Sequence, residues 1–145
     1  MTPLAYAKLG LETFACHYPV INGAGCCSCG DVNCGSAAKH PYPRHAPKGF
    51  KSASKDPRAI VKWASGPFNI GVACGTVSGV IVLDIDPRND GDESLAKLEA
   101  EYGPLPVTWR AFTGGGGEHF YFAHPGGHID RNDFAPGINL KGDGG

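Results

Sequence analysis

The sequence predicts an α+β fold whose sheet is mostly antiparallel. Strand-like segments follow one another with a single helical segment inserted, without the alternating strands and helices that indicate a parallel sheet. The 22 glycines and 12 prolines indicate many turns rather than long helices. With 145 residues the chain has the size of one domain, so we predict a single domain over residues 1–145.

The first half of the chain combines two helical segments with a long irregular stretch. Residues 3–14 carry apolar side chains at helical spacing after a proline, which predicts a short amphipathic helix. The stretch from Cys16 to Phe50 has no periodicity, and so long a loop in a compact domain needs a stabilising feature. Residues 54–65 predict a second helix, with Asp56 as N-cap and Pro57 at the first helical position.

The second half of the chain predicts strands around one helix. Two short strands are joined around residues 75–79, a helix follows that ends at a glycine, and a hairpin closes over four glycines. In order, the predicted segments are strands 68–75 and 79–86, helix 92–103, hairpin strands 107–114 and 118–125, and strand 137–142.

Composition and charge restrict the classes of function. The formal net charge of −1 argues against a strongly basic nucleic-acid coat, although a local basic groove needs no net charge. Five cations between Lys39 and Lys55 form either an approach face for nucleic acid or triphosphate, or ordinary solvated surface. No apolar run approaches the ~20 residues of a membrane span, and the N-terminus lacks a secretory signal. We therefore expect a cytoplasmic protein without a membrane partner, and the abrupt glycine-rich end predicts a C-terminally truncated fragment.

Two acids stand at the end of an apolar run, in the segment VIVLDID. Alternate strand residues share a face, so Asp84 and Asp86 point the same way, with Cα atoms roughly 7 Å apart at ~3.4 Å per residue. Carboxylates this close can converge on two divalent cations that clamp the attacking and leaving oxygens of a phosphoryl transfer. Oxygen ligands favour Mg²⁺ or Mn²⁺ over zinc. The alternative is a strand end at which two polar residues reach water.

A run of four glycines, residues 114–117, precedes His119 in the segment TGGGGEHFYF. Glycines let backbone N–H groups approach a ligand closely, and successive N–H groups can form an anion-binding nest. A histidine beside such a loop can donate to a phosphate. The segment is not a Walker loop, because no Gly-Lys-Ser/Thr follows. The alternative is a flexible hairpin turn with an incidental histidine.

A cysteine-rich segment lies in the long irregular stretch. Thiolates and an imidazole at these short spacings suit tetrahedral Zn²⁺, and metal binding would keep the stretch folded. The alternative is a set of reduced, unliganded cysteines. The predicted ligands are Cys27, Cys29, Cys34 and His40. Residues that could replace one of them are Cys16, His17, Cys26 and His45.

These stretches, taken in order, resemble a known family. CSCGDVNCGSAAKHP, KGFKSASKDPRAIVKWASGPFNIGVACGTVSGVIVLDID, FTGGGGEHFYF and GINLKGDGG are similar to the bifunctional DNA primase/polymerase N-terminal domain. This prim-pol type belongs to the archaeo-eukaryotic primase superfamily and occurs in phages, plasmids and integrated elements. The resemblance runs from Cys27 to Gly145. It implies an RRM-like sheet core, with a DNA template and primer, nucleoside triphosphates and a downstream helicase domain as partners.

The resemblance also implies roles for particular residues. The family's acid pair falls on Asp84 and Asp86, and its small-residue-x-His motif falls on residues 117–119, without the usual serine. The third family acid falls on Asn139, which can ligate a metal through its carbonyl, and Asp143 could compensate for the missing charge. The implied nucleotide-binding residues are Gly115, Gly116, Gly117, His119 and Lys141.

Two other functions remain open at this point. A non-catalytic zinc-bearing nucleic-acid-binding module, derived from a primase, would account for the asparagine in place of the third acid. A metal-dependent nuclease could use the same two acids. The predicted activity is template-directed nucleotidyl transfer, in which a 3′-hydroxyl attacks the α-phosphate of the incoming nucleotide.

Overall fold

The chain forms two compact units, each with its own antiparallel sheet. The computed structural model describes residues 1–21, 27–130 and 132–144. The first unit comprises Met1–Ala73 and the second Cys74–Gly145. The α+β class with antiparallel sheets is as predicted. Composition gave no indication of this division, and the single domain over residues 1–145 stays a prediction.

The first unit begins with a shorter helix than predicted. Helix α1 (Pro3–Lys8) is capped by Thr2, whose side chain accepts a hydrogen bond from the amide of Ala5. Gly10 has a φ of +86°, which takes the chain out of the helix. The prediction of a helix to residue 14 is therefore wrong, because the next residues form strand β1 (Thr13–Cys16), which is paired with strand β2 (Asn69–Val72).

The rest of the first unit packs round these two strands. Between Cys27 and Lys48 the chain has no helix or strand, as predicted, and it touches β1 through a bridge between Cys16 and Pro41. A 3₁₀ helix, η1 (Gly49–Ser52), follows. Helix α2 (Pro57–Ile60) has the predicted aspartate cap but is much shorter than predicted. A core cluster is formed by Ala15, Ile60 and Trp63.

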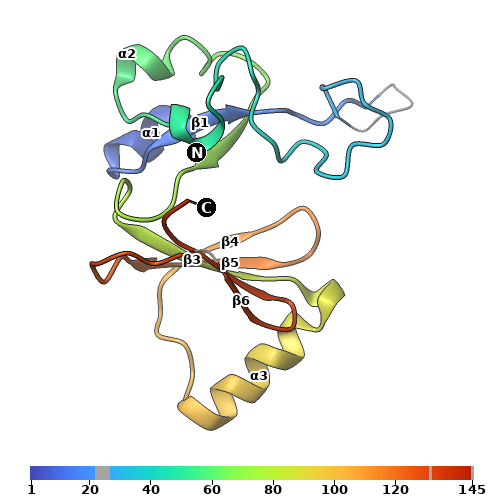
Figure 1. Cartoon of the computed structure of the whole chain (residues 1–145), viewed down its shortest axis with the longest axis vertical. Helices are drawn as coiled ribbons and strands as arrows, with labels where there is room; N and C mark the ends of the chain where they lie inside the picture. The colour runs from blue at the N-terminus through green and yellow to red at the C-terminus, as the bar shows by residue number, and fades with distance from the viewer. Residues whose placement is uncertain (22–26, 131, 145) are drawn as a thin grey trace. The chain divides into compact units, whose positions relative to one another are not determined.

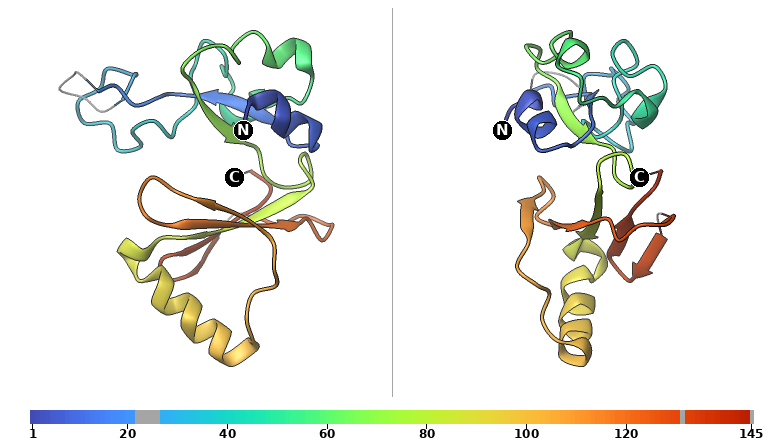
Figure 2. Two further views of the ribbon diagram at one scale, coloured as in Figure 1. Left: turned by 180° about the vertical axis from the view of Figure 1, so that it is seen from behind. Right: turned by 90° about the vertical axis from the view of Figure 1, so that its left-hand side faces the viewer.

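The second unit is a five-stranded sheet with one helix on a face. The strand order is β4-β5-β3-β7-β6, and every neighbouring pair is antiparallel. Helix α3 lies on one side of this sheet (Figure 1, Figure 2). The elements are β3 (Val80–Ile85), the 3₁₀ helix η2 (Pro87–Asn89), α3 (Gly91–Tyr102), β4 (Trp109–Phe112), β5 (Glu118–Ala123), β6 (Asn132–Ala135) and β7 (Ile138–Lys141).

Several predictions for this unit are confirmed and others are not. The β4–β5 hairpin, α3 and β7 lie where the sequence predicted them. Strands β2 and β3, predicted as a consecutive pair, belong to different sheets, since both edges of β3 are taken by β5 and β7. Strand β6 was not predicted. Within the described residues, no helix combines the length and the apolar character needed to cross a membrane.

Candidate active site and metal cluster

Asp84 lies in the middle of the five-stranded sheet, in a row with two other polar side chains. The pairing of β3 with β5 and with β7 sets Asp84 opposite both His119 and Asn139. Residues opposite each other on antiparallel neighbours project from the same face, so the three side chains stand side by side. His119 Nε2 is 3.3 Å from Asp84 Oδ1. The sheet therefore brings together an acid, an imidazole and an amide that are far apart in the sequence.

A lysine approaches Asp84 from the neighbouring strand. Lys141 lies on β7 opposite Val82 of β3, and its Nζ is 3.6 Å from Asp84 Oδ2. The hydrogen bond from His119 lowers the pKa of the Asp84 carboxyl, partial burial opposes this, and the charges of His119 and Lys141 lower the pKa further. Asp84 is thus an ionised carboxylate with a nitrogen donor on each side.

Asp86 begins the turn after β3 and is held by groups of that turn. Its side chain caps η2 by accepting the backbone N–H of Arg88 at 3.1 Å. The Arg88 guanidinium donates through Nε and Nη2 to the two carboxylate oxygens, each at 2.9 Å, and Asn89 Nδ2 donates to Oδ2 at 3.0 Å. The hydrogen bond from Arg88 lowers the pKa of Asp86 to about 2, against the opposing effect of burial.

Two glycines, Gly91 and Gly137, hold the turn that carries Asp86 against the β6–β7 turn. The N–H of Asp86 donates to the carbonyl of Gly137 at 2.8 Å. Gly137, in the β6–β7 turn, has a φ of +65°, and a methyl group there would collide with the backbone nitrogen of Gly91. A methyl group on Gly91 would in turn lie 2.5 Å from the Gly137 carbonyl oxygen. The start of α3 and the turn before β7 thus approach so closely that only glycine fits both positions.

The glycine-rich loop between β4 and β5 lies against the end of β3. A methyl group on Gly117 would collide with the carbonyl oxygen of Ile85, and one on Gly115 would lie 3.3 Å from Arg88 Cζ. Inside the loop, Gly116 N–H donates to the Thr113 carbonyl and Gly117 N–H to Thr113 Oγ1, both at 3.0 Å. These two amides are satisfied within the loop, so an anion would be met by the N–H groups at the start of the glycine run.

Four side chains of the first unit gather round one point. Cys27, Cys29, Cys34 and His40 each place one ligand atom within 4.8 Å of the others. His40 Nε2 is 3.4 Å from Cys27 Sγ and 3.5 Å from Cys34 Sγ. With Zn–S near 2.3 Å and Zn–N near 2.0–2.1 Å, tetrahedral angles separate sulfur from nitrogen by about 3.5 Å. This Cys₃His cluster, the predicted ligand set, can therefore hold a zinc ion.

The surroundings of Cys27 favour its metal-binding form, and contacts with the residue after β1 hold His40 in place. Burial raises the pKa of the Cys27 thiol, but hydrogen bonds outweigh burial, first among them the 3.3 Å bond from the Ala38 amide, and lower the pKa to about 6. A thiolate is the form that binds metal. His40 is anchored beside the end of β1, because its carbonyl accepts the N–H of His17 at 2.9 Å and the two rings lie with centroids 4.3 Å apart, tilted by 30°.

A family model described as bifunctional DNA primase/polymerase, N-terminal, matches residues 3–145. The chain belongs to this family. The resemblance noted in the sequence is thereby confirmed, and family membership implies nucleotidyl transfer as the general type of activity. Neither a curated protein nor a solved structure matches the chain. The antiparallel α+β architecture is consistent with a primase-type domain.

One residue predicted for the prim-pol site lies away from the acid pair. By the register of β3 and β7, Asp143 would stand level with Val80, four residues before Asp84 on its strand. The structure therefore brings Asn139, and not Asp143, beside Asp84. The carboxylate of Asp143 accepts hydrogen bonds from the N–H and hydroxyl of Thr76, the N–H of Ile129 and Nε2 of His124.

Of the alternative zinc ligands, the three that lie in the described part of the prim-pol chain do not join the cluster. Cys16 is buried in β1, and burial raises the pKa of its thiol to about 11. His17 Nδ1 is engaged with a serine hydroxyl at 2.7 Å. His45 stacks on the ring of a tyrosine. Cys26 lies outside the described residues.

Sequence reasoning gave no role to three residues near the acid row. Arg88 donates two side-chain hydrogen bonds to Asp86. The sequence signal for this pair was an arginine two positions after a capping aspartate. Trp109 and Tyr121 are cross-strand partners on the sheet face that also carries Asp84, and Trp109 is 58% exposed. Nothing in the sequence revealed this pair, because it depends on the register of the β4–β5 hairpin.

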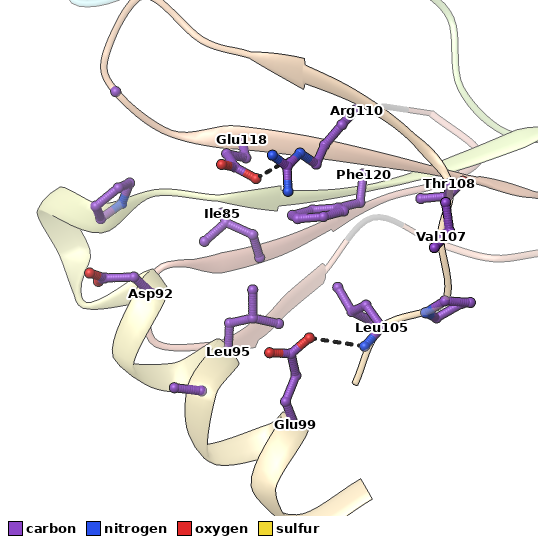
Figure 3. Close-up of a pocket in the computed structure, with 14 residues that line it drawn as sticks. Ile85, Asp92, Leu95, Glu99, Leu105, Val107, Thr108, Arg110, Glu118 and Phe120 are labelled. Atoms are coloured by element: carbon purple, nitrogen blue, oxygen red, sulfur yellow. Dashed lines mark hydrogen bonds and ion pairs between the residues drawn. The ribbon is translucent and has the colours of Figure 1, made fainter. Parts of the chain in front are cut away.

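A cavity of about 580 Å³ lies between α3 and the sheet. Figure 3 shows Leu95 of α3 facing Ile85 and Phe120 of the sheet, with Arg110 paired to Glu118 at 3.4 Å. Ile85 and Phe120 alternate along their strands with Asp84 and His119, so the cavity lies on the opposite face from the acid row. The cavity and the candidate site are therefore separate features of the prim-pol sheet.

Proposed function

We propose that this chain is the catalytic domain of a DNA primase/polymerase that carries out template-directed, divalent-metal-dependent nucleotidyl transfer in the replication of a phage, plasmid or integrated element. The observation that carries the proposal is the row of Asp84, His119 and Asn139 across three strands, with Asp86 two residues after Asp84, directly beyond β3. A helix on one face of an antiparallel sheet and a functional row on the other support an RRM-like core for this activity.

The side chains of the row suit a hard divalent cation. Asp84 and Asp86 offer carboxylate oxygens, and Asn139 offers a neutral amide oxygen, which are the donors that Mg²⁺ and Mn²⁺ prefer. Bound there, two such ions would neutralise charge on the attacking and leaving oxygens of the transfer. The amide adds a ligand without adding charge, so these residues leave more positive charge on the ions than three acids would.

Other residues of the same face would position the nucleotide and the nucleic acid. His119 Nε2 already donates to a carboxylate oxygen, and the same N–H can donate to a phosphate oxygen. Lys141 would add charge at the phosphates. Of the predicted loop residues 115–117, Gly115 would offer its N–H, since those of Gly116 and Gly117 donate to Thr113. Trp109 and Tyr121 present π-faces on which a base of the template or primer can stack. In such a site, catalysis is mostly positioning and charge stabilisation.

The zinc cluster would serve the fold and not the chemistry. Its donor set of three thiolates and one imidazole is complete, and a closed tetrahedral set leaves no position for substrate. We therefore propose a structural Zn²⁺ in the first unit beside the Mg²⁺ or Mn²⁺ of the second.

The test is Mn²⁺- or Mg²⁺-dependent extension of a primed DNA template. Asp84→Asn and Asp86→Asn each remove a charged ligand at nearly constant volume, and we expect incorporation to fall by about 100-fold or more. Asp92→Asn, the same change at an exposed acid of α3, is the matched control and should retain activity. Full activity of either site variant, in protein with wild-type circular dichroism, would contradict the assignment.

One observation favours a second candidate, a non-catalytic module that binds nucleic acid and nucleotides. Asn139 stands where the family has an acid, and both remaining acids are paired with cations, Lys141 and Arg88. If triphosphate binds but no nucleotide is incorporated with either metal, this binding function is the correct one. Cleavage of single-stranded DNA in the absence of nucleotides would instead indicate a nuclease.

A further inference from the structure

Arg88 lies between the two parts of the proposed site. Its guanidinium bonds to both carboxylate oxygens of Asp86, and Gly115 of the glycine-rich loop packs against the same group, since a methyl group there would lie 3.3–3.5 Å from Cζ, Nη2 and Nη1. The loop is the proposed phosphate-binding element and Asp86 a proposed metal ligand. One cation therefore contacts both the place for the metal and the place for the phosphates.

The pairing with Asp86 leaves part of the guanidinium free to act elsewhere. An arginine carries five N–H donors, and two of these are given to Asp86 by Nε and Nη2. The remaining donors suit bidentate recognition of a phosphate. The Arg88 side chain is 65% exposed, so its head can move without disturbing packed neighbours.

A local turn motif by itself does not explain this position. The first unit contains the same tripeptide, in which Asp56 caps α2 and accepts hydrogen bonds from Nε and Nη2 of Arg58 at 3.0–3.2 Å. The carboxylate–arginine pair is thus what an Asp-Pro-Arg turn forms wherever it occurs. What differs at Arg88 is its setting, because Asp84 adds a second nearby negative charge and the glycine loop lies alongside.

The two acids are already neutralised before any metal arrives. Arg88 is paired with Asp86, and Lys141 lies 3.6 Å from Asp84, so each carboxylate has one cationic partner. Both oxygens of Asp86 accept hydrogen bonds from Arg88, so a cation that uses one of them must displace at least one of these bonds. A divalent ion would also repel the guanidinium.

We propose that Arg88 exchanges partners during the reaction cycle: it holds Asp86 while the metal is absent, and it moves to the phosphates of the incoming nucleotide when Asp86 takes the metal. This inference rests on the proposed function, because it concerns the same site. Arg88 then competes with the metal alone but assists the metal–nucleotide complex. The two effects have opposite signs, which a residue that merely supports the turn would not produce.

The experiment measures Mn²⁺ binding by electron paramagnetic resonance, and deoxynucleoside triphosphate binding by calorimetry in saturating Mn²⁺, on the full chain. For Arg88→Ala we expect Mn²⁺ alone to bind about tenfold more tightly and triphosphate to bind at least about tenfold more weakly. Arg88→Lys keeps the charge without the planar fork and should give smaller changes in both directions. Arg58→Ala is the matched control and should change neither affinity.

The outcomes separate this inference from the proposed function. If the wild-type chain and the Asp86→Asn variant bind Mn²⁺ with the same affinity, the proposed metal site itself is wrong. If Asp86→Asn loses Mn²⁺ while Arg88→Ala matches the wild type in both measurements, the partner exchange is wrong and the site stands. If Arg88→Ala weakens Mn²⁺ and triphosphate together, Arg88 only supports the turn, and the inference is again overturned. Zinc content and circular dichroism of each variant verify folding.

Discussion

The two units each bring together a group of polar side chains that we propose as a functional site, and the two groups are built in opposite ways. In the first unit, the cluster draws all four ligands from residues 27–40, a stretch without helix or strand. In the second, Asp84, His119 and Asn139 come from three different strands and meet through backbone pairing. The cluster is local in sequence and irregular in structure, whereas the acid row is distant in sequence and regular in structure.

This difference determines what holds the ligands in place. The sheet positions Asp84 by backbone hydrogen bonds on both sides, and its charge is balanced by Lys141, so the row does not require a metal to form. The stretch that carries the cluster has no such ladder, and the binding energy of a structural zinc becomes folding energy. We therefore expect metal to be a folding requirement in the first unit and a functional requirement in the second.

The largest expected effect is the loss of the zinc. Chelation, or Cys29→Ser, should unfold the Cys27–His40 stretch, since apparent binding free energies of structural zinc are about 10–16 kcal/mol. Hydrogen exchange should then accelerate at the N–H of His17, which donates to the His40 carbonyl. The amides of β3 in the second unit should keep their protection.

Two controls make this result specific. Trp109→Phe leaves Trp63, a core residue of the first unit, as the tryptophan whose fluorescence reports that unit. Cys74→Ala removes a buried cysteine of the second unit and should leave the zinc content at one per chain. Native protein without zinc, or equal loss of protection in β3 on chelation, would show that the contrast between the units is wrong.

A smaller effect should follow from filling the glycine contact that fixes Asp86. Gly137→Ala forces a side chain into left-handed backbone and into collision with Gly91, so we expect the second unit to lose about 3 kcal/mol or more in urea unfolding. The displaced turn carries the carbonyl that accepts the Asp86 N–H, so Mn²⁺ binding should weaken as well. The zinc content of the first unit should not change.

Gly79→Ala is the matched control for this substitution. Gly79 has nearly the same φ, +66°, but no atom within 4 Å of an added methyl group, so only the backbone strain of about 1–2 kcal/mol applies. If Gly137→Ala costs no more than Gly79→Ala, the close approach of the two glycines does not stabilise the site.

The same contrast explains how much the sequence could predict. The four side chains predicted as zinc ligands, Cys27, Cys29, Cys34 and His40, do lie together in a group that could hold a metal ion. They could be predicted because ligands within a short segment can be recognised by their spacing. Hairpin β4–β5 and helix α3 were also predicted, since a glycine run and a helical apolar pattern are local signals.

Features that depend on long-range pairing were not accessible in this way. The residues after Gly10 carried a helical pattern, yet they form β1, because pairing with β2 fifty-odd residues later overrides local propensity. The separation of β2 and β3 into two sheets has the same cause. In the sequence, Asp143 was predicted to share a strand face with Asn139. In the structure, β7 ends at Lys141, and by the register of β3 and β7 Asp143 would stand level with the residue four positions before Asp84.

The smallest expected effect concerns acid and the stability of the second unit. The Asp143 carboxyl accepts hydrogen bonds from the N–H of Ile129 and from the hydroxyl and N–H of Thr76, and these hold its pKa well below the usual range. Because the folded pKa lies below the unfolded value of about 3.9, this contribution to stability is fully present above pH 4 and declines as the pH falls further. Urea unfolding followed through β3 amides should show that decline. The Asp143→Asn variant should have a lower free energy of unfolding at pH 7, and below pH 4 this free energy should change less with pH than in the wild type. A decline of equal size in the Asp143→Asn variant would assign the acid sensitivity to other carboxylates of the sheet, Asp84 and Asp86 first among them.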